Sequence, residues 1–232
     1  MARSRSARAG GIQMTEGSLY KNILLFSVPL IFSQLLQVLF NMADVAVVGK
    51  FSSATALGSV GSTSTLVTLF TGFLIGLSNG VNVRVAQYLG ARQETETRSC
   101  VHTALILCTL SGLVIAVLCF FLAVPMLELL KTKDDLLPGA VLYFRIYALG
   151  MPALGIFNFG NAVLSANGDT KRPLVYLTIA GVLNVILNLF FVIVCKMAAD
   201  GVALASVISQ YVSAILVVWH MMRLNDACKF YF

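Results

Sequence analysis

Residues 22–48 read NILLFSVPLIFSQLLQVLFNMADVAVV, an apolar run of 27 residues that lies between Lys21 and Lys50. An α-helix rises about 1.5 Å per residue, so a helix of this length is roughly 40 Å long and exceeds the ~30 Å hydrocarbon core of a bilayer. The only ionisable side chain in the run is that of Asp44. The stretch therefore predicts a membrane-spanning helix that carries one carboxyl group.

Five further apolar runs of spanning length follow the first one along the chain. They lie at about 54–78, 100–125, 140–165, 174–195 and 201–222. The exposed helices of soluble proteins keep a polar face, and these runs mostly lack one. The sequence therefore predicts an all-α, polytopic membrane protein whose six transmembrane helices form one lobe over residues 14–225.

The composition of the whole chain fits a lipid-embedded protein and excludes several other classes. Hydrophobic residues make up 58% of the 232 residues, charged residues make up 11%, and the mean hydropathy is +0.88. An ordinary soluble domain has about 25% charged residues. The net charge of +6 is spread over the connections between apolar runs, so it indicates no nucleic-acid partner. The five cysteines have neither metal-ligand nor disulfide-scaffold spacing.

The basic residues in the short connections predict the orientation in the membrane, because Lys and Arg gather on the cytoplasmic side. One side would hold eleven of them, including those at both chain ends, and the other side would hold Lys50, Lys131, Lys133 and Lys196. Arg145 falls inside the fourth run. We therefore expect both termini to be cytoplasmic and the protein to span the plasma membrane, the inner membrane of a bacterium.

The two ends of the chain are expected to lie outside the helical lobe. Residues 1–13 read MARSRSARAGGIQ and contain no acidic residue. We expect translation to start at Met14, with a short transit-peptide-like extension as the alternative. Residues 226–232 are expected to form a truncated tail.

Polar side chains in the first run share one face of the predicted helix. At 100° per residue, Ser27, Gln34, Gln37, Asn41 and Asp44 fall within an arc of about 100°. Polar groups inside a membrane span are costly and normally face the protein interior. Asp44 is the natural partner for a cation or a proton. It would lie near the outer end of the helix unless a kink at Pro29 draws it inward.

Three other runs carry similar polar stripes. Asn184 and Asn188 lie four residues apart in the fifth run. Ser206 and Gln210 share a face of the sixth run, as do Asn158 and Asn161 in the fourth. Together the stripes indicate a wet cavity. The alternative is that Asp44 is an interfacial carboxylate close to Lys50, with the amides serving as hydrogen bonds between helices.

No motif in the chain supports an enzyme or a bound cofactor. Residues 76–80, GLSNG, match the G-x-S-x-G pattern, but a nucleophile elbow needs a preceding strand and a nearby His and acid. HExxH, P-loop and GxGxxG patterns are absent from the sequence. We therefore expect no catalytic residue, no cofactor and no metal beyond a possible Na⁺ at Asp44.

Five segments in order give the chain a family resemblance. They are Pro29-Leu30 with Gln34, Asp44 and Gly49; Gln87-Tyr88-Leu89-Gly90-Ala91; Asn167-Gly168-Asp169-Thr170-Lys171-Arg172-Pro173; Asn184-x-x-x-Asn188; and the stretch from Gly201 to Gln210. Over about residues 14–225 the chain resembles the multidrug and toxic compound extrusion (MATE) family.

The resemblance implies an antiporter that expels drugs or other organic cations in exchange for Na⁺ or H⁺. Members have twelve helices in two six-helix lobes, with the substrate between them, so this chain is similar to the N-terminal lobe. The implied partners are a small organic substrate, the lipid bilayer and a C-terminal lobe. A second copy of the chain is the alternative to that lobe.

The resemblance also implies an ion site. In one branch of the family this site uses an Asp on the first helix, an Asn and an Asp four apart on the fifth, and a Thr on the sixth. Those positions correspond here to Asp44, Asn184, Asn188 and Ser206, and Pro29 corresponds to a hinge. Asn188 replaces the second carboxylate, so the site has one negative charge and the choice between Na⁺ and H⁺ stays open.

Two other functions remain alternatives at this point. A flippase for lipid-linked or polysaccharide precursors would use a similar lobe, with more cationic residues toward its cavity than Arg145 alone. A non-transporting assembly module would scatter its polar residues around the helices instead of aligning them. The chain is further expected to be a fragment of a longer gene, with a functional half-transporter as the alternative.

Overall fold

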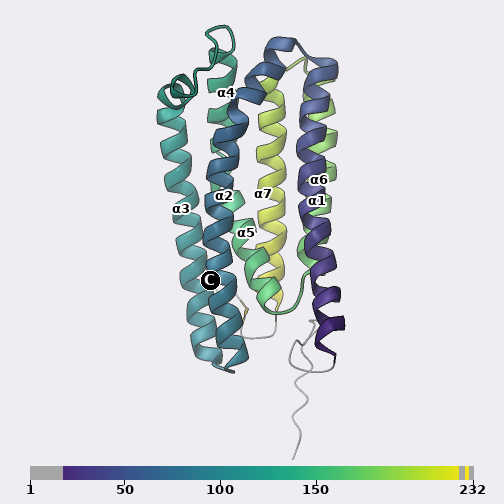
Figure 1. The fold of residues 1–232 in the computed structure, drawn as a ribbon, viewed down its shortest axis with the longest axis vertical. Helices are drawn as coiled ribbons and strands as arrows, with labels where there is room; N and C mark the ends of the chain where they lie inside the picture. Colours follow the sequence, from purple (N-terminus) through teal and green to yellow (C-terminus); the bar gives the residue numbers. More distant parts are fainter. Residues whose placement is uncertain (1–17, 225–227, 230–232) are drawn as a thin grey trace, which may run out of the picture.

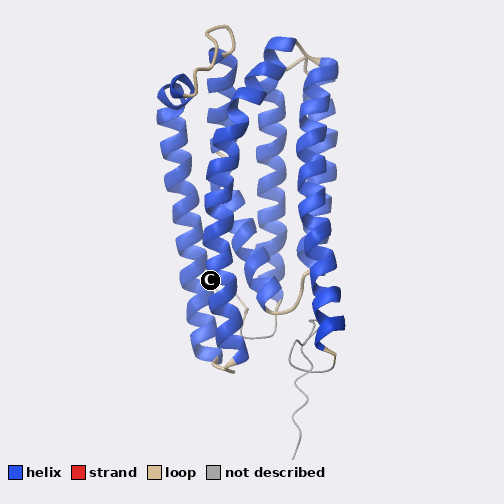
Figure 2. Ribbon diagram, in the orientation of Figure 1, coloured by secondary structure: helices blue, strands red, loops and turns tan. Residues whose placement is uncertain are grey.

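The computed structural model describes residues 18–224 and 228–229, and the expected N-terminal extension and most of the expected tail lie outside these residues. Every regular element in the described part is a helix (Figure 2). The elements are α1 (Leu19–Phe51), α2 (Ala54–Gly90), α3 (Glu94–Leu129), α4 (Leu137–Ala148), α5 (Met151–Ala166), α6 (Lys171–Leu189), the π-helical turn η1 (Phe190–Val194) and α7 (Ala199–Arg223).

The helices form a bundle whose members run alternately in opposite directions (Figure 1). Five helices are long and apolar enough to cross a membrane, and the bent pair α4 and α5 gives a sixth span. This confirms the predicted all-α membrane protein with six spans. The start of α1 and the end of α7 lie at the same end of the bundle, the lower end in Figure 1.

The fourth span is not the single helix predicted over 140–165. It breaks after Ala148 and bends by 46° between α4 and α5. Pro152 explains the break, because it has no N–H for the carbonyl of Ala148 four residues earlier and its ring crowds that carbonyl. At the break, the carbonyl of Leu149 accepts a hydrogen bond from the hydroxyl of Tyr211 on α7, at 3.0 Å. The break is therefore held by a side chain from a distant part of the chain.

The second and third spans are longer than the apolar runs that predicted them. The run at 54–78 is the first part of a helix that continues to Gly90, and the third helix begins at Glu94 instead of 100. Arg84 and Arg98 consequently lie on helices and not in a loop. These helix ends extend past the hydrocarbon core, because 37 residues of α-helix measure about 55 Å.

The core of the bundle surrounds α5, which packs against α2, α3 and α7. Its side chains Phe157, Phe159 and Leu164 are almost completely buried. In contrast, α1 packs mainly on α6, and only 6% of its most apolar window is buried within the chain. The helix that carries Asp44 is thus largely exposed and contacts the bundle mainly through α6.

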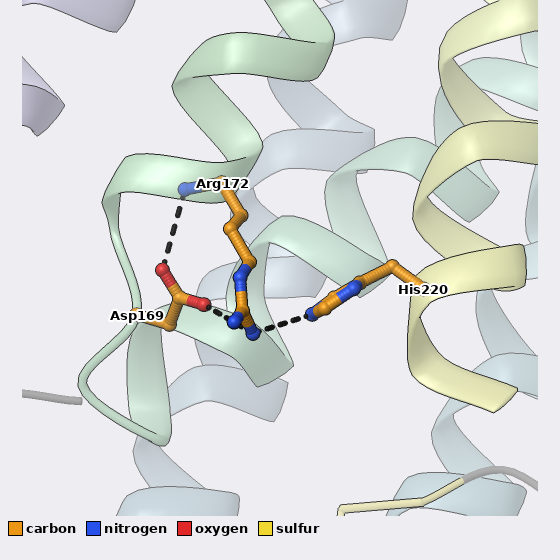
Figure 3. A network of polar contacts seen from close by, with 3 residues as sticks. All are labelled: Asp169, Arg172 and His220. Atoms are coloured by element: carbon orange, nitrogen blue, oxygen red, sulfur yellow. Dashed lines mark hydrogen bonds and ion pairs between the residues drawn. The ribbon is translucent and has the colours of Figure 1, made fainter. Parts of the chain in front are cut away.

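A polar network fastens the loop between α5 and α6 to α7 (Figure 3). Asp169 accepts a hydrogen bond from the backbone N–H of Arg172 at 3.2 Å and forms an ion pair with its guanidinium at 3.1 Å. The same guanidinium donates to Nε2 of His220 on α7 at 2.9 Å. Three side chains thereby connect the start of α6 to the end of α7.

We expect Arg172→Ala to lower the stability of the protein by about 1 kcal/mol, because the guanidinium is partly exposed and such ion pairs contribute little. The measurement is thermal unfolding of the purified chain in detergent. Lys171→Ala, at the exposed neighbouring position, is the control and should leave the melting temperature unchanged. Equal shifts for the two variants would show that the network does not hold the loop.

Candidate ion site and polar cavity

Four side chains from three helices form a closed ring of hydrogen bonds in the half of the bundle that holds the end of α1 and the start of α7. Nδ2 of Asn188 on α6 donates to Oδ1 of Asp44 on α1 at 2.5 Å and to Oδ1 of Asn184 at 3.2 Å. Nδ2 of Asn184 donates to Oγ of Ser206 on α7 at 3.2 Å. Ser206 Oγ donates to Oδ2 of Asp44 at 3.4 Å, which closes the ring.

The ring follows from the geometry of the helices that carry it. Asn184 and Asn188 are one turn apart, so they lie on the same face of α6. Asp44 lies seven residues before the end of α1, and Ser206 lies seven residues after the start of α7. Both positions are therefore about 10 Å from the helix ends that lie at the upper end of the bundle in Figure 1. The structure thus brings together the four residues expected to bind the coupling ion.

The hydrogen-bond directions in the ring match an ionised Asp44, which can only accept. Both N–H bonds of Asn188 are used, and its carbonyl oxygen is buried without a hydrogen-bond partner. Asn184, Asn188 and Ser206 are each less than 7% exposed. A buried carbonyl oxygen beside a carboxylate is an arrangement that a small cation can complete.

The charge of the ring favours a monovalent ligand. Its oxygens come from one carboxylate, two amides and one hydroxyl, so the set carries a single negative charge. Within the part of the chain that the structure describes, no group of three His, Cys, Asp or Glu side chains is placed to hold a metal ion. A proton or one Na⁺ would neutralise Asp44, whereas a divalent ion would leave a buried positive charge.

Two tyrosines of α4 lie beside the ring and were not among the residues singled out from the sequence. Tyr143 and Tyr147 stack on each other with ring centroids 6.0 Å apart. Tyr143 is buried in the same cluster as Val47 and Val48, which follow Asp44 on α1. The i, i+4 spacing of the two tyrosines is the sequence signal that could have identified them, because it places both rings on one helix face.

A separate polar cavity of about 360 Å³ lies between α1, α2 and α5. It includes four of the residues expected to line a cavity, namely Gln34, Gln37, Asn158 and Asn161. Asn79 and Asn82 of α2 complete the set of amides and were not predicted. None of the described residues that line it carries a charge, so its surface offers hydrogen-bonding groups and apolar contacts.

Two of the expected cavity residues do not lie there. Asn41 is exposed on α1 and does not line the cavity. Gln210 has its Oε1 buried against Gly150, at the break between α4 and α5, where any side chain on Gly150 would collide with it. The helical phase predicts on which face of its helix a residue lies, but the position of the neighbouring helix determines what the side chain contacts.

The helix at Pro29 and the location of Arg145 also differ from what the sequence alone suggests. Pro29 is buried, and α1 continues through it as one helix, so the broken span is the fourth and not the first. Arg145 donates from Nε to the carbonyl of Phe120 at 3.1 Å and does not line the cavity. The cavity therefore lacks the cationic lining expected of a flippase for anionic precursors.

The chain is similar to known membrane transporters in sequence and in fold. The family described as MatE matches residues 29–190. A probable multidrug resistance protein of Bacillus subtilis, YpnP, is 31% identical over 209 residues, which are 90% of this chain and 47% of that protein. The probable multidrug resistance protein NorM of Thermotoga maritima is 24% identical over 215 residues, 89% of this chain and 45% of that protein.

Solved structures share the fold. An outward-facing multidrug resistance MATE family transporter of the MOP superfamily superposes with a TM-score of 0.88 at 22% identity, over 96% of this chain and 49% of that one. A MOP superfamily transporter from Pyrococcus furiosus superposes with a TM-score of 0.86 at 23% identity, over 92% of this chain and 47% of that one. The chain spans about half the length of the curated relatives it matches.

Proposed function

This chain belongs to the MatE family of multidrug transporters, and from that premise we propose that it forms one lobe of an exporter that exchanges drug-like organic molecules for Na⁺ or H⁺. The second lobe would be a further six-helix unit, or less simply a second copy of this chain. Both termini would be cytoplasmic in the plasma membrane, in keeping with the bias of Lys and Arg toward that side.

The observation that carries the proposal is the hydrogen-bonded ring around Asp44. An ionisable residue inside a membrane span is expensive and is expected to serve ion movement. Here the carboxylate meets amides from α6 and a hydroxyl from α7, with the buried Oδ1 of Asn188 left without a partner. One Na⁺ could be held by these oxygens, or one proton could neutralise Asp44 in their place.

The uncharged cavity between α1, α2 and α5 is the proposed substrate site. It is separate from the ring, because none of the four ring residues lines it. Both sites include residues of α1, so this helix offers a mechanical connection between ion binding and substrate binding. Its shallow burial is consistent with a helix that changes position between two states.

A flux measurement tests the proposed exchange. The chain, joined to the second lobe that completes the exporter, is reconstituted into sealed vesicles that contain ethidium, and dye release is followed with an inward Na⁺ gradient, with an inward proton gradient and with neither. We expect release with one of the two gradients and none without a gradient. Release that is equally fast without a gradient would identify a passive channel, and no release under any condition would contradict the proposed exchange.

The cavity also gives a prediction about substrate affinity. Asn161→Leu replaces a polar side chain of the lining by an apolar one with the same number of non-hydrogen atoms, so ethidium should bind about three- to tenfold more weakly, the equivalent of one hydrogen bond. Asn41→Leu makes the same change on an exposed part of α1 and should leave the affinity unchanged. The measurement is dye fluorescence with the chain in lipid nanodiscs. If Asn41→Leu had the larger effect, the substrate site would have to be placed elsewhere.

A further inference from the structure

One contact between α1 and α6 leaves no room for a side chain on α6. The ring of Phe40 on α1 lies directly over Gly181 on α6, which is buried. A Cβ atom added to Gly181 would lie 1.9 Å from Cε2 and 2.1 Å from Cζ of Phe40. Carbon atoms in ordinary contact are about 3.5–4 Å apart, so only glycine allows the ring to sit at this depth.

This contact lies on the same seam as the Asp44 ring. Phe40 precedes Asp44 by one helical turn, so the two side chains point from the same face of α1. Gly181 precedes Asn184 by three residues and Asn188 by seven, which places all three on one face of α6. Since α1 and α6 run in the same direction, the Phe40 contact lies directly below the hydrogen bonds of Asp44.

We propose that the packing of the Phe40 ring on Gly181 fixes the position of α1 on α6 and thereby places the carboxylate of Asp44 against Asn188. Phe40 and Gly181 are then positioning residues for the ion site, an inference that rests on the proposed function of that site. This contact can determine the position of α1 because few of the residues in the apolar part of that helix are buried within the chain.

The distances show why a small displacement matters. A methyl group on Gly181 would have to push the ring away by about 1.5 Å or more to reach an ordinary contact distance. The hydrogen bond from Ser206 to Asp44 is already 3.4 Å long, and bonds of this type are lost when they lengthen further. An outward shift of α1 would therefore open the ring at Asp44 first.

Cross-linking measures this placement without any ion. In a cysteine-free background, Asp44→Cys and Asn188→Cys are introduced together, and disulfide formation is timed with an oxidant in nanodiscs. We expect Gly181→Ala to slow the reaction about tenfold. With Phe40→Ala also present, Gly181→Ala should cause no further slowing, because the colliding ring is gone. Gly76→Ala is the control, since a Cβ there meets nothing within 4 Å.

Binding of Na⁺ and protons is measured separately with Asp44 and Asn188 intact. Gly181→Ala should weaken the ion-dependent rise in melting temperature, with about a tenfold loss of affinity, as is typical for disturbing the support of an ion ligand. In a Phe40→Ala background, the proteins with Gly and with Ala at position 181 should bind the ion with equal affinity. Loss of a general packing contact would change the melting temperature but not the ion dependence.

The outcomes separate the two proposals. If the Gly181→Ala variant forms the disulfide as fast as the parent, or is slowed equally with and without Phe40, the positioning role is wrong. This holds regardless of the result of the ion-binding measurements. If cross-linking follows the prediction while no variant responds to Na⁺ or pH, the positioning stands and the ion function fails. Should Gly181→Ala not fold, Phe40→Leu takes its place with an expected threefold slowing, and an unchanged rate overturns the role.

Discussion

Asp44→Asn is expected to abolish the response of the protein to Na⁺ and to proton gradients while leaving the fold intact. Asparagine has nearly the same size and can still accept a hydrogen bond from Asn188, so the ring keeps its packing. It carries no charge and takes up no proton near neutral pH. Na⁺ binding should weaken by more than the roughly 10–100-fold that follows loss of an outer-shell partner, because a direct ligand is removed.

The measurements for this variant are gradient-driven dye release from vesicles and the Na⁺-dependent shift in melting temperature. Glu94→Gln removes an exposed carboxylate at the other end of the bundle and serves as the matched control. The control should retain both responses. If the Asp44→Asn protein still released dye in a gradient-dependent manner, the coupling group would have to lie outside the ring.

The ring around Asp44 could be predicted from the sequence because each of its parts is a local pattern. A lone carboxyl group in an apolar run must find polar partners, and Asn184 and Asn188 repeat at the helical spacing. The family resemblance added Ser206 and the pairing of the three helices. The directions of the hydrogen bonds could not be predicted, since they depend on side-chain geometry within fractions of an ångström.

The break in the fourth span could not be located from hydropathy, because residues 146–157 on both sides of it read IYALGMPALGIF and are continuously apolar. Its local cause, Pro152 after Gly150, was visible in the sequence. A proline inside a span is compatible with a kinked helix or with a full break, depending on which groups satisfy the freed carbonyls. Here the hydroxyl of Tyr211 donates to the carbonyl of Leu149 at the break, 62 residues away along the chain.

The predictions of the helix ends and of two cavity-lining residues were wrong for a related reason. An apolar run marks the part of a helix that lies in hydrocarbon, whereas hydrogen bonding continues into the headgroup region, as in α2 up to Gly90. Asn41 and Gln210 have the correct helical phase for a polar face. A polar face lines a cavity only if the neighbouring helix lies far enough away to leave space. The sequence of one helix does not predict the distance between the two helices.

The break between α4 and α5 makes Gly112 on α3 a position where one added methyl group should lower stability strongly. A Cβ on Gly112 would lie 2.8 Å from the carbonyl oxygen of Met151 and 2.8 Å from Cα of Pro152. These are backbone atoms at the start of α5, the most enclosed helix of the bundle, and they cannot turn aside as a side chain can. Gly112→Ala must therefore separate α3 from α5 or distort the break.

We expect Gly112→Ala to destabilise the protein by about 1–3 kcal/mol, the usual cost of overpacking a filled core. The measurement is thermal unfolding in detergent, with Gly72→Ala as the matched control. A Cβ at Gly72 meets nothing within 4 Å, and alanine is the better helix former, so that variant should be unchanged or slightly more stable. If both variants unfolded at the same temperature, α3 would have to tolerate displacement from the broken span, and the rigid packing around α5 would be disproved.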